Sequence, residues 1–160
     1  MNFEEYLEEL ASSSRKLKIA ELQRLSDLSP EQAAQFAARW ADINVRRRRR
    51  VLQELIDLAE DTVELNFVAV FRHALKDDDA EARLAAVRGL WEQESPDLID
   101  NLTALAETDD SAAVRAEAAL ALGRFVLLFE IGRLRERHFE RAAAALRRAV
   151  EHAGEIEEVR

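Results

Sequence analysis

Apolar residues recur along this chain at intervals of three and four positions, which is the spacing of one face of an α-helix. Phe3, Tyr6 and Leu10 show the pattern close to the N-terminus. The same pattern continues almost to the end of the chain. It predicts helices over residues 3–10, 17–28, 30–40, 44–60, 63–75, 80–93, from 96 to the turn at 109, 112–132 and 133–152.

Several turns carry the residues that start helices. Ser29 is followed by a proline, and Gln32 stands three positions later, as in a capping box. Ser95 also precedes a proline, and acidic runs stand before residues 80 and 112. An aspartate at a helix start accepts bonds from free backbone N–H groups and complements the helix dipole. Gly154 is predicted to end the last helix as a C-cap.

An acidic turn and the start of the helix that follows it occur twice in the sequence. Residues 76–83 match residues 108–115 at an offset of 32 positions, which brings Arg83 onto Arg115. A period in this range indicates stacked helical units. The chain therefore reads as helical hairpins over 30–60, 64–93 and 96–132, with an incomplete one from 135.

Composition agrees with an all-α domain. Hydrophobic residues make up 48% and charged residues 34% of 160 positions, and strong helix formers dominate. The formal net charge of −9 argues against a general nucleic-acid coat, and zero cysteines exclude disulfides and thiolate chemistry. The acidic N-terminus is no secretion signal, and no apolar run is long enough to span a membrane. We expect a cytoplasmic protein.

The repeated stretch resembles the HEAT-like repeat family, including its bacterial short-repeat branch. The resemblance covers the chain from Pro30 onward and rests on three copies of one motif: Asp78 with Arg83, Leu84, Ala86 and Leu90; Asp110 with Val114, Arg115, Ala118 and Leu122; and, more weakly, Asp42 with Val45 and Arg46.

This resemblance implies a right-handed α-solenoid that acts as a non-enzymatic protein-binding or scaffold module, with partners on the concave face lined by second helices. It also implies a structural ladder between adjacent units, formed by Asp42, Arg46, Asp78, Arg83, Asp110 and Arg115. One branch of the family serves phycobilin attachment and would imply a tetrapyrrole lyase-like accessory protein, but no residue here argues for that role.

The predicted domain division separates residues 1–28 from residues 29–160. The first segment is either a cap that covers the open face of the first hairpin or a mobile docking arm. The second segment is the HEAT-like repeat domain.

Five consecutive arginines, Arg46 to Arg50, are the least ordinary feature of the sequence. Arg48 falls on the apolar stripe of its helix, so it must meet a buried acid or extend out at the helix end. The others are either solvated and paired within the protein or form an anion site of Arg46, Arg47, Arg49 and Arg50. Such a site for nucleic acid or phosphate is the alternative function.

No constellation of catalytic, cofactor-binding or metal-binding residues is predicted. The three histidines, His73, His138 and His152, do not pair at ligand spacing. The acidic runs lack the ligand pattern of a calcium-binding loop, and helix capping explains them. No phosphate-binding glycine loop or nucleophile motif is present.

Residues 125–129 form a second unusual stretch, because they add an apolar turn to a helix that should end near Phe125. This turn either packs on the last helix or leaves an apolar patch for a partner at Phe125, Leu128 and Phe129.

Residues 155–160 repeat the acidic turn and Val-Arg that open earlier second helices. We therefore expect the chain to be an N-terminal piece of a longer repeat protein, in which a further helix would cover Phe139, Leu146 and Val150. The alternative is a polar tail.

Overall fold

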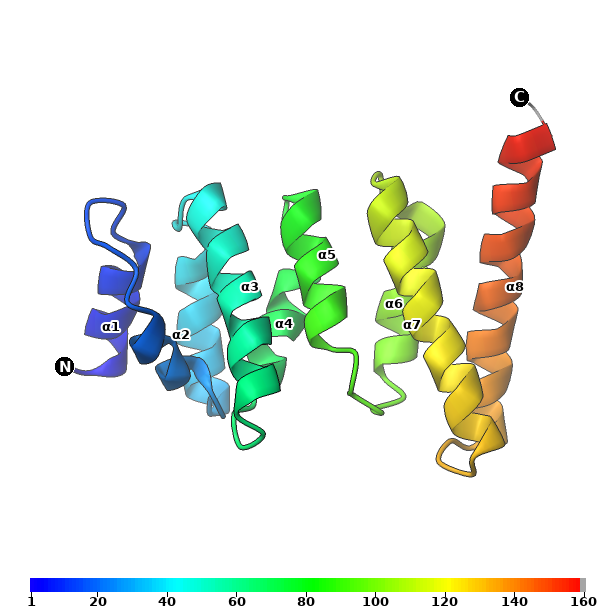
Figure 1. The fold of residues 1–160 in the computed structure, drawn as a ribbon, viewed down its shortest axis with the longest axis horizontal. Coiled ribbons are helices and arrows are strands. Elements are labelled where there is room, and N and C mark those ends of the chain that lie inside the picture. Colours follow the sequence, from blue (N-terminus) through cyan, green and yellow to red (C-terminus); the bar gives the residue numbers. More distant parts are fainter. Residues whose placement is uncertain (159–160) are drawn as a thin grey trace. The chain divides into compact units, whose positions relative to one another are not determined.

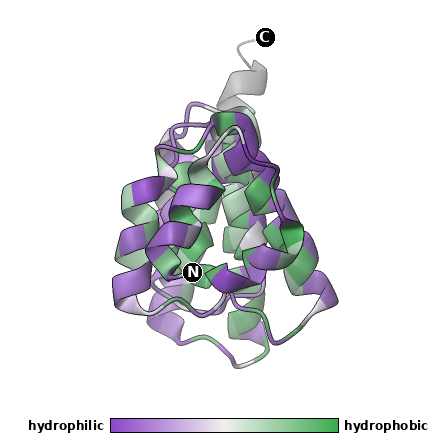
Figure 2. Ribbon diagram, turned by 90° about the vertical axis from the view of Figure 1, so that its left-hand side faces the viewer, coloured by the Kyte–Doolittle hydropathy of each residue, from purple (hydrophilic) through white to green (hydrophobic). Residues whose placement is uncertain are grey.

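The computed structural model describes residues 1–158, with side chains as far as Ala153, and this part of the chain contains helices and no strand. The chain divides into two compact units, Met1–Leu90 and Trp91–Arg160. Hydrophobic and hydrophilic residues alternate along the helical ribbons, as amphipathic helices require (Figure 2).

The first unit consists of five α-helices and a 3₁₀ helix. α1 packs on α2 and η1 on α3, while α2 lies against α4, and α3 and α4 both lie against α5 (Figure 1). The N-terminal segment therefore buries its apolar side chains against the helices that follow it; Tyr6, Leu7 and Leu10 are at most 2% exposed. The bounds are α1 Phe3–Ala11, η1 Ile19–Leu25, α2 Pro30–Trp40, α3 Val45–Asp61, α4 Val68–Ala74 and α5 Ala80–Gly89.

The second unit is a three-helix arrangement in which α6, α7 and α8 each contact the other two. α7 ends where Gly132 takes a positive φ of 78°, a conformation that glycine adopts without cost. Phe129, in the last turn of α7, stacks on Phe139 of α8 with ring centroids 4.3 Å apart. The bounds are α6 Leu98–Thr108, α7 Ala112–Glu130 and α8 Glu136–Glu158.

Helix starts follow the capping signals of the sequence. Ser29 forms the predicted capping box with Gln32. Asp79 and Ser111 cap α5 and α7 by accepting from the backbone N–H three residues later. The turn before each of these two helices is therefore fixed by its own short side chains.

Several predicted boundaries are wrong. The segment predicted as a helix over residues 17–28 is a 3₁₀ helix over Ile19–Leu25, and the helix predicted from residue 133 begins at Glu136. The helix expected from residue 63 begins at Val68, because Thr62 closes α3 and the side chain of Asn66 accepts from the N–H of Val68. The helix expected to reach residue 93 ends at Gly89. Gly154 is not a C-cap, since α8 continues through it to Glu158.

The end of the chain is only partly described. Residues 155–158 continue α8 and do not form the predicted acidic turn. Val159 and Arg160, which carry the proposed repeat opening, lie outside the described residues.

Candidate functional site

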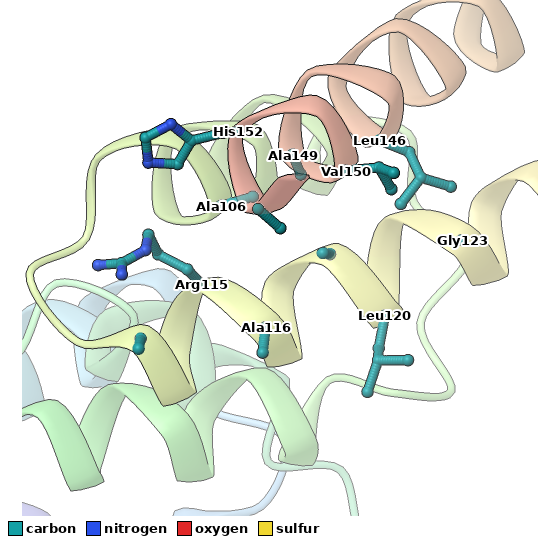
Figure 3. Close-up of a pocket in the computed structure, with 12 residues that line it drawn as sticks. Ala106, Arg115, Ala116, Leu120, Gly123, Leu146, Ala149, Val150 and His152 are labelled. Atoms are coloured by element: carbon teal, nitrogen blue, oxygen red, sulfur yellow. The ribbon is translucent and has the colours of Figure 1, made fainter. Parts of the chain in front are cut away.

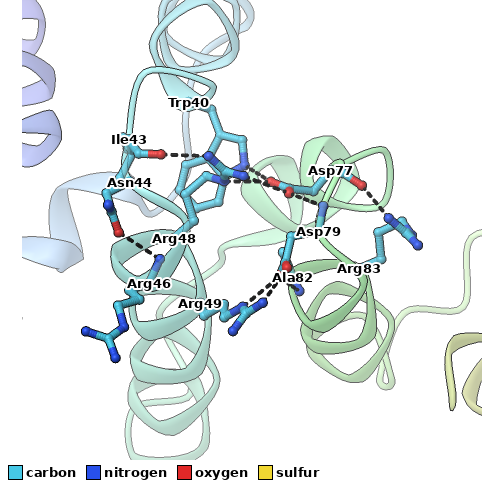
Figure 4. A network of polar contacts seen from close by, with 10 residues as sticks. All are labelled: Trp40, Ile43, Asn44, Arg46, Arg48, Arg49, Asp77, Asp79, Ala82 and Arg83. Atoms are coloured by element: carbon cyan, nitrogen blue, oxygen red, sulfur yellow. Dashed lines mark hydrogen bonds and ion pairs between the residues drawn. The ribbon is translucent and has the colours of Figure 1, made fainter. Parts of the chain in front are cut away.

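The buried carboxylate of Asp77 is the centre of a polar network in the first unit (Figure 4). It accepts from the indole Nε1 of Trp40 at 2.6 Å and from Nη2 of Arg48 at 3.3 Å, and Nε of Arg48 lies 3.1 Å away. Its other contact is with its own turn, where it accepts from the N–H of Asp79 at 2.9 Å. The expectation that Arg48 must meet a buried acid is confirmed.

Arg49 makes a second link between α3 and the start of α5. Its Nε and Nη2 donate to the two carboxylate oxygens of Asp79 at 2.8 and 2.6 Å. Asp79 also caps α5 through the N–H of Ala82. The hydrogen bond from Arg49 is the main reason that the pKa of Asp79 lies below its usual range, and the cap contributes to the same shift.

The predicted ladder residues are placed differently from the expected pairs. Asp78 and Asp110 are exposed, whereas the first acid of the earlier run, Asp77, is buried. Nη1 of Arg83 donates to the carbonyl of Asp77 at 2.8 Å, and Nη1 of Arg115 donates to the carbonyl of Asp109 at 2.6 Å. Each of these two arginines therefore fixes the turn that precedes its own helix.

The weakest copy of the motif is out of register. Asp42 and Arg46 are both exposed, and the residue that stands where Arg83 and Arg115 stand is Arg48. All three arginines follow the N-cap of their helix by four positions, the caps being Asn44, Asp79 and Ser111. Counting from the cap would have revealed this register in the sequence.

The arginine run offers little free positive charge. Arg47 donates to the carbonyl of Arg15 at 2.6 Å, and Arg49 is committed to Asp79. Arg46 and Arg50 are exposed, and Arg50 has a glutamate, Glu54, at 3.8 Å. Two of the four residues of the candidate anion site are therefore bound within the protein, and the other two are exposed.

The candidate apolar patch at the end of α7 is mostly buried. Phe125 is 2% exposed and Leu128 is 5% exposed, so these two side chains are not available to a partner, and that part of the prediction is wrong. Phe129 is half-buried against Phe139. The extra turn packs on the last helix through Phe129, whereas Leu127 of the same turn is 55% exposed.

An open apolar groove lies instead between the first half of α7 and the second half of α8, over α6 (Figure 3). Its volume is about 710 Å³. Leu120 is 61% exposed and Val150 is 65% exposed. Most other lining residues are alanines, with Gly123 and Leu146 near one end.

Two polar side chains, Arg115 and His152, also line this groove. Figure 3 shows both at the end opposite to Gly123 and Leu146. The groove is therefore apolar along most of its length and carries nitrogen donors at one end. Residues 112–131 are nearly all apolar, so the sequence pattern does not indicate which side of α7 is open.

No group of three or more His, Asp or Glu side chains among the residues that the structure describes could hold a metal ion. His73 lies edge-on to Phe36, with ring centroids 6.0 Å apart, and burial lowers its pKa against the opposing effect of Asp77.

None of the helices between residues 1 and 158 is both long enough and apolar enough to cross a membrane.

Comparison with known proteins identifies the family. The sequence profile described as HEAT repeats matches residues 68–160, which is more than half of the chain. No curated protein and no solved structure matches the chain significantly. The profile match and the helical structure together confirm the predicted all-α fold class and the HEAT-like resemblance. The chain belongs to the HEAT repeat family.

Proposed function

We propose that this chain is a non-enzymatic protein-binding module and that the groove between α7 and α8 is its binding surface. HEAT repeats generally mediate protein–protein interaction or scaffolding. The observation that carries the proposal is the exposure of large apolar side chains, Leu120 and Val150, on the two sides of one groove. Clustered exposed apolar side chains mark interaction sites, whereas scattered ones do not.

The chemistry of the lining supports binding rather than catalysis. General acid–base catalysis needs positioned groups that exchange a proton with the substrate. The ionisable residues that line the groove are Arg115 and His152, and Arg115 is bound to the carbonyl of Asp109. An arginine keeps its proton in proteins and serves as a donor to acidic groups. His152 is exposed at one end of the groove.

The shape of the groove supports a protein ligand. It is open along two helices, and its small side chains, among them Ala116, Ala119 and Gly123, allow another backbone to approach closely. Grooves of this kind accept the apolar face of an amphipathic helix.

The proposal is tested by affinity purification from the source cell with the full chain as bait. We expect a set of co-purifying proteins that is retained with Val63→Glu and lost with Val150→Glu. Val63 is a matched control because it is an exposed valine, at 90% exposure, in the first unit. Circular dichroism would establish that both variants keep their helices. Identical sets of proteins with both variants would refute the groove as the binding surface.

A further inference from the structure

Arg48 at the start of α3 binds the turn before α5, and Arg115 stands at the equivalent position of α7. Arg48 and Arg115 each follow the N-cap of their helix by four positions, and each binds a carbonyl of the turn before its helix through Nη1. The acceptors are the carbonyls of Ile43 and Asp109, both at 2.6 Å. One nitrogen of each guanidinium is therefore bound to the turn before its own helix. The other nitrogens can donate to a group on a neighbouring helix.

In the first unit the neighbour of Arg48 is the turn before α5. The remaining nitrogens of Arg48 meet the carboxylate of Asp77, which stands two positions before the N-cap of α5 (Figure 4). Arg49 meets Asp79, the N-cap itself. The arginines of α3 thus bind an acidic turn at the start of α5, and the two helices lie side by side with their N-terminal ends together.

Arg115 holds the same place at the start of α7. In the described part of the chain no carboxylate lies within ion-pair distance of it. Its side chain lines the groove between α7 and α8, and His152 lies at the same end (Figure 3). The guanidinium of Arg48 binds an acidic turn in the first unit. The guanidinium of Arg115, at the equivalent helix position, lies at the end of an open apolar groove.

The apolar part of the groove has the dimensions of a helix. It runs along α7 from Ala112 to Gly123, which corresponds to roughly 16 Å or three helical turns. Leu120 stands on one side, and Leu146 and Val150 stand on the other. A helix laid parallel to α7 would cover these side chains and bring its own N-terminal turn to Arg115.

We propose that the groove binds an amphipathic helix of a partner protein, and that this helix begins with an acidic turn whose aspartate pairs with Arg115. The inference rests on the proposed function and adds the partner's chemistry. The apolar face consists of alanine and medium-sized aliphatic side chains, as in α5, where Ala82, Ala86 and Val87 are buried. The aspartate stands two positions before the helix cap, as Asp77 does.

A labelled synthetic peptide of residues 74–90 is the probe, because it contains α5 with its acidic turn. Binding to the full chain is measured by fluorescence anisotropy. We expect saturable binding that Asp77→Asn in the peptide weakens about tenfold, as loss of a charged hydrogen-bond partner does. Arg115→Gln in the chain should weaken it by the same factor, with no further loss when both changes are combined.

The controls are Asp78→Asn in the peptide and Arg133→Gln in the chain, both of which should leave the affinity unchanged. Asp78 is exposed beside α5, and Arg133 pairs with Glu94 away from the groove. The effect of Asp77→Asn is measured with the unchanged chain, so it remains informative even if Arg115→Gln impairs folding.

Two results would overturn the inference. One is absence of saturable binding up to about 1 mM peptide, or binding that ignores both Asp77→Asn and Arg115→Gln. The other is a dimer of the chain, seen by light scattering, that Val150→Glu dissociates, because a second copy would then occupy the groove. If the affinity purification still depends on Val150, the proposed function stands and only the acidic-turn helix is refuted.

Discussion

At the scale of single residues, Asp77 is the most constrained side chain of the first unit. It is the one polar or charged residue that is buried among the described side chains, and it serves Trp40, Arg48 and its own turn. The sequence predicted the partner requirement of Arg48 but assigned the ladder to Asp78. Three adjacent aspartates look alike in a sequence, and only the packing of the turn decides which of them points inward.

Removal of this carboxylate should destabilise the protein strongly. Asp77→Ala leaves the guanidinium of Arg48, whose side chain is 12% exposed, without its acid, which we expect to lower the free energy of unfolding by roughly 2–4 kcal/mol. Asp78→Ala, at an exposed position of the same turn, should change it by less than about 0.5 kcal/mol. Urea unfolding measures both. Equal effects would show that the network around Asp77 does not stabilise the fold.

Asp79 should make stability depend on pH in the acid range. Its pKa is lowered in the fold, first by Arg49 and further by the backbone N–H of Ala82, so the unfolded chain takes up the proton more readily. The stabilisation is therefore complete above the unfolded pKa of about 3.9 and is lost as the pH falls through the lower folded value. Urea unfolding of the wild type and of Asp79→Asn should converge as the pH falls below about 4. A constant difference between pH 7 and pH 3 would contradict this assignment.

At the scale of the elements, hydrophobic periodicity was sufficient to place the helices, because an amphipathic face is a local property of the sequence. It was insufficient at the start of α4, where Asp61 and Thr62 resemble a cap but Thr62 closes α3. It was also insufficient for the groove. Leu120 and Leu122 are equally apolar neighbours on α7, yet one is 61% exposed and the other is fully buried. Which face of α7 is covered depends on α6 and α8, and no local pattern contains that information.

Two helical glycines allow a matched test of helix packing. A Cβ atom at Gly89 would lie 2.4 Å from the ring of Phe71, whereas one at Gly123 would lie 3.9 Å from Leu146, an ordinary contact. We expect Gly89→Ala to lower the free energy of unfolding by about 1–3 kcal/mol through overpacking. Gly123→Ala should raise it by about 0.5–1 kcal/mol through helix propensity. Thermal or urea unfolding decides the signs, and stabilisation by both changes would show that α5 and α4 can move apart at no cost.

At the scale of the whole molecule, the chain belongs to the HEAT repeat family and has a formal net charge of −9. The fold class, the family and the order of the helices could be predicted from the sequence, since all three follow from repeated local patterns. The division into units at Leu90 could not, because it depends on contacts between helices that are distant in sequence.

The same charge leads us to expect no binding of nucleic acid by the arginine run. Arg47 and Arg49 are bound within the protein, which leaves Arg46 and Arg50 exposed in an acidic molecule. Fluorescence anisotropy with labelled single- and double-stranded DNA and RNA at low salt checks this. Binding that weakens steeply with salt and disappears in Arg46→Glu/Arg50→Glu would establish the anion site instead.

The link between Arg48 and Asp77 also has an evolutionary consequence. The hairpin of α4 and α5 carries Asp77, which pairs with Arg48, and it also carries Arg83 four positions after the cap of its own second helix. We expect a tandem duplication of this hairpin to place an arginine beside an aspartate at the new junction without any further mutation. Such an array could change its length by recombination and keep this ion pair, while selection acts on the outward-facing residues.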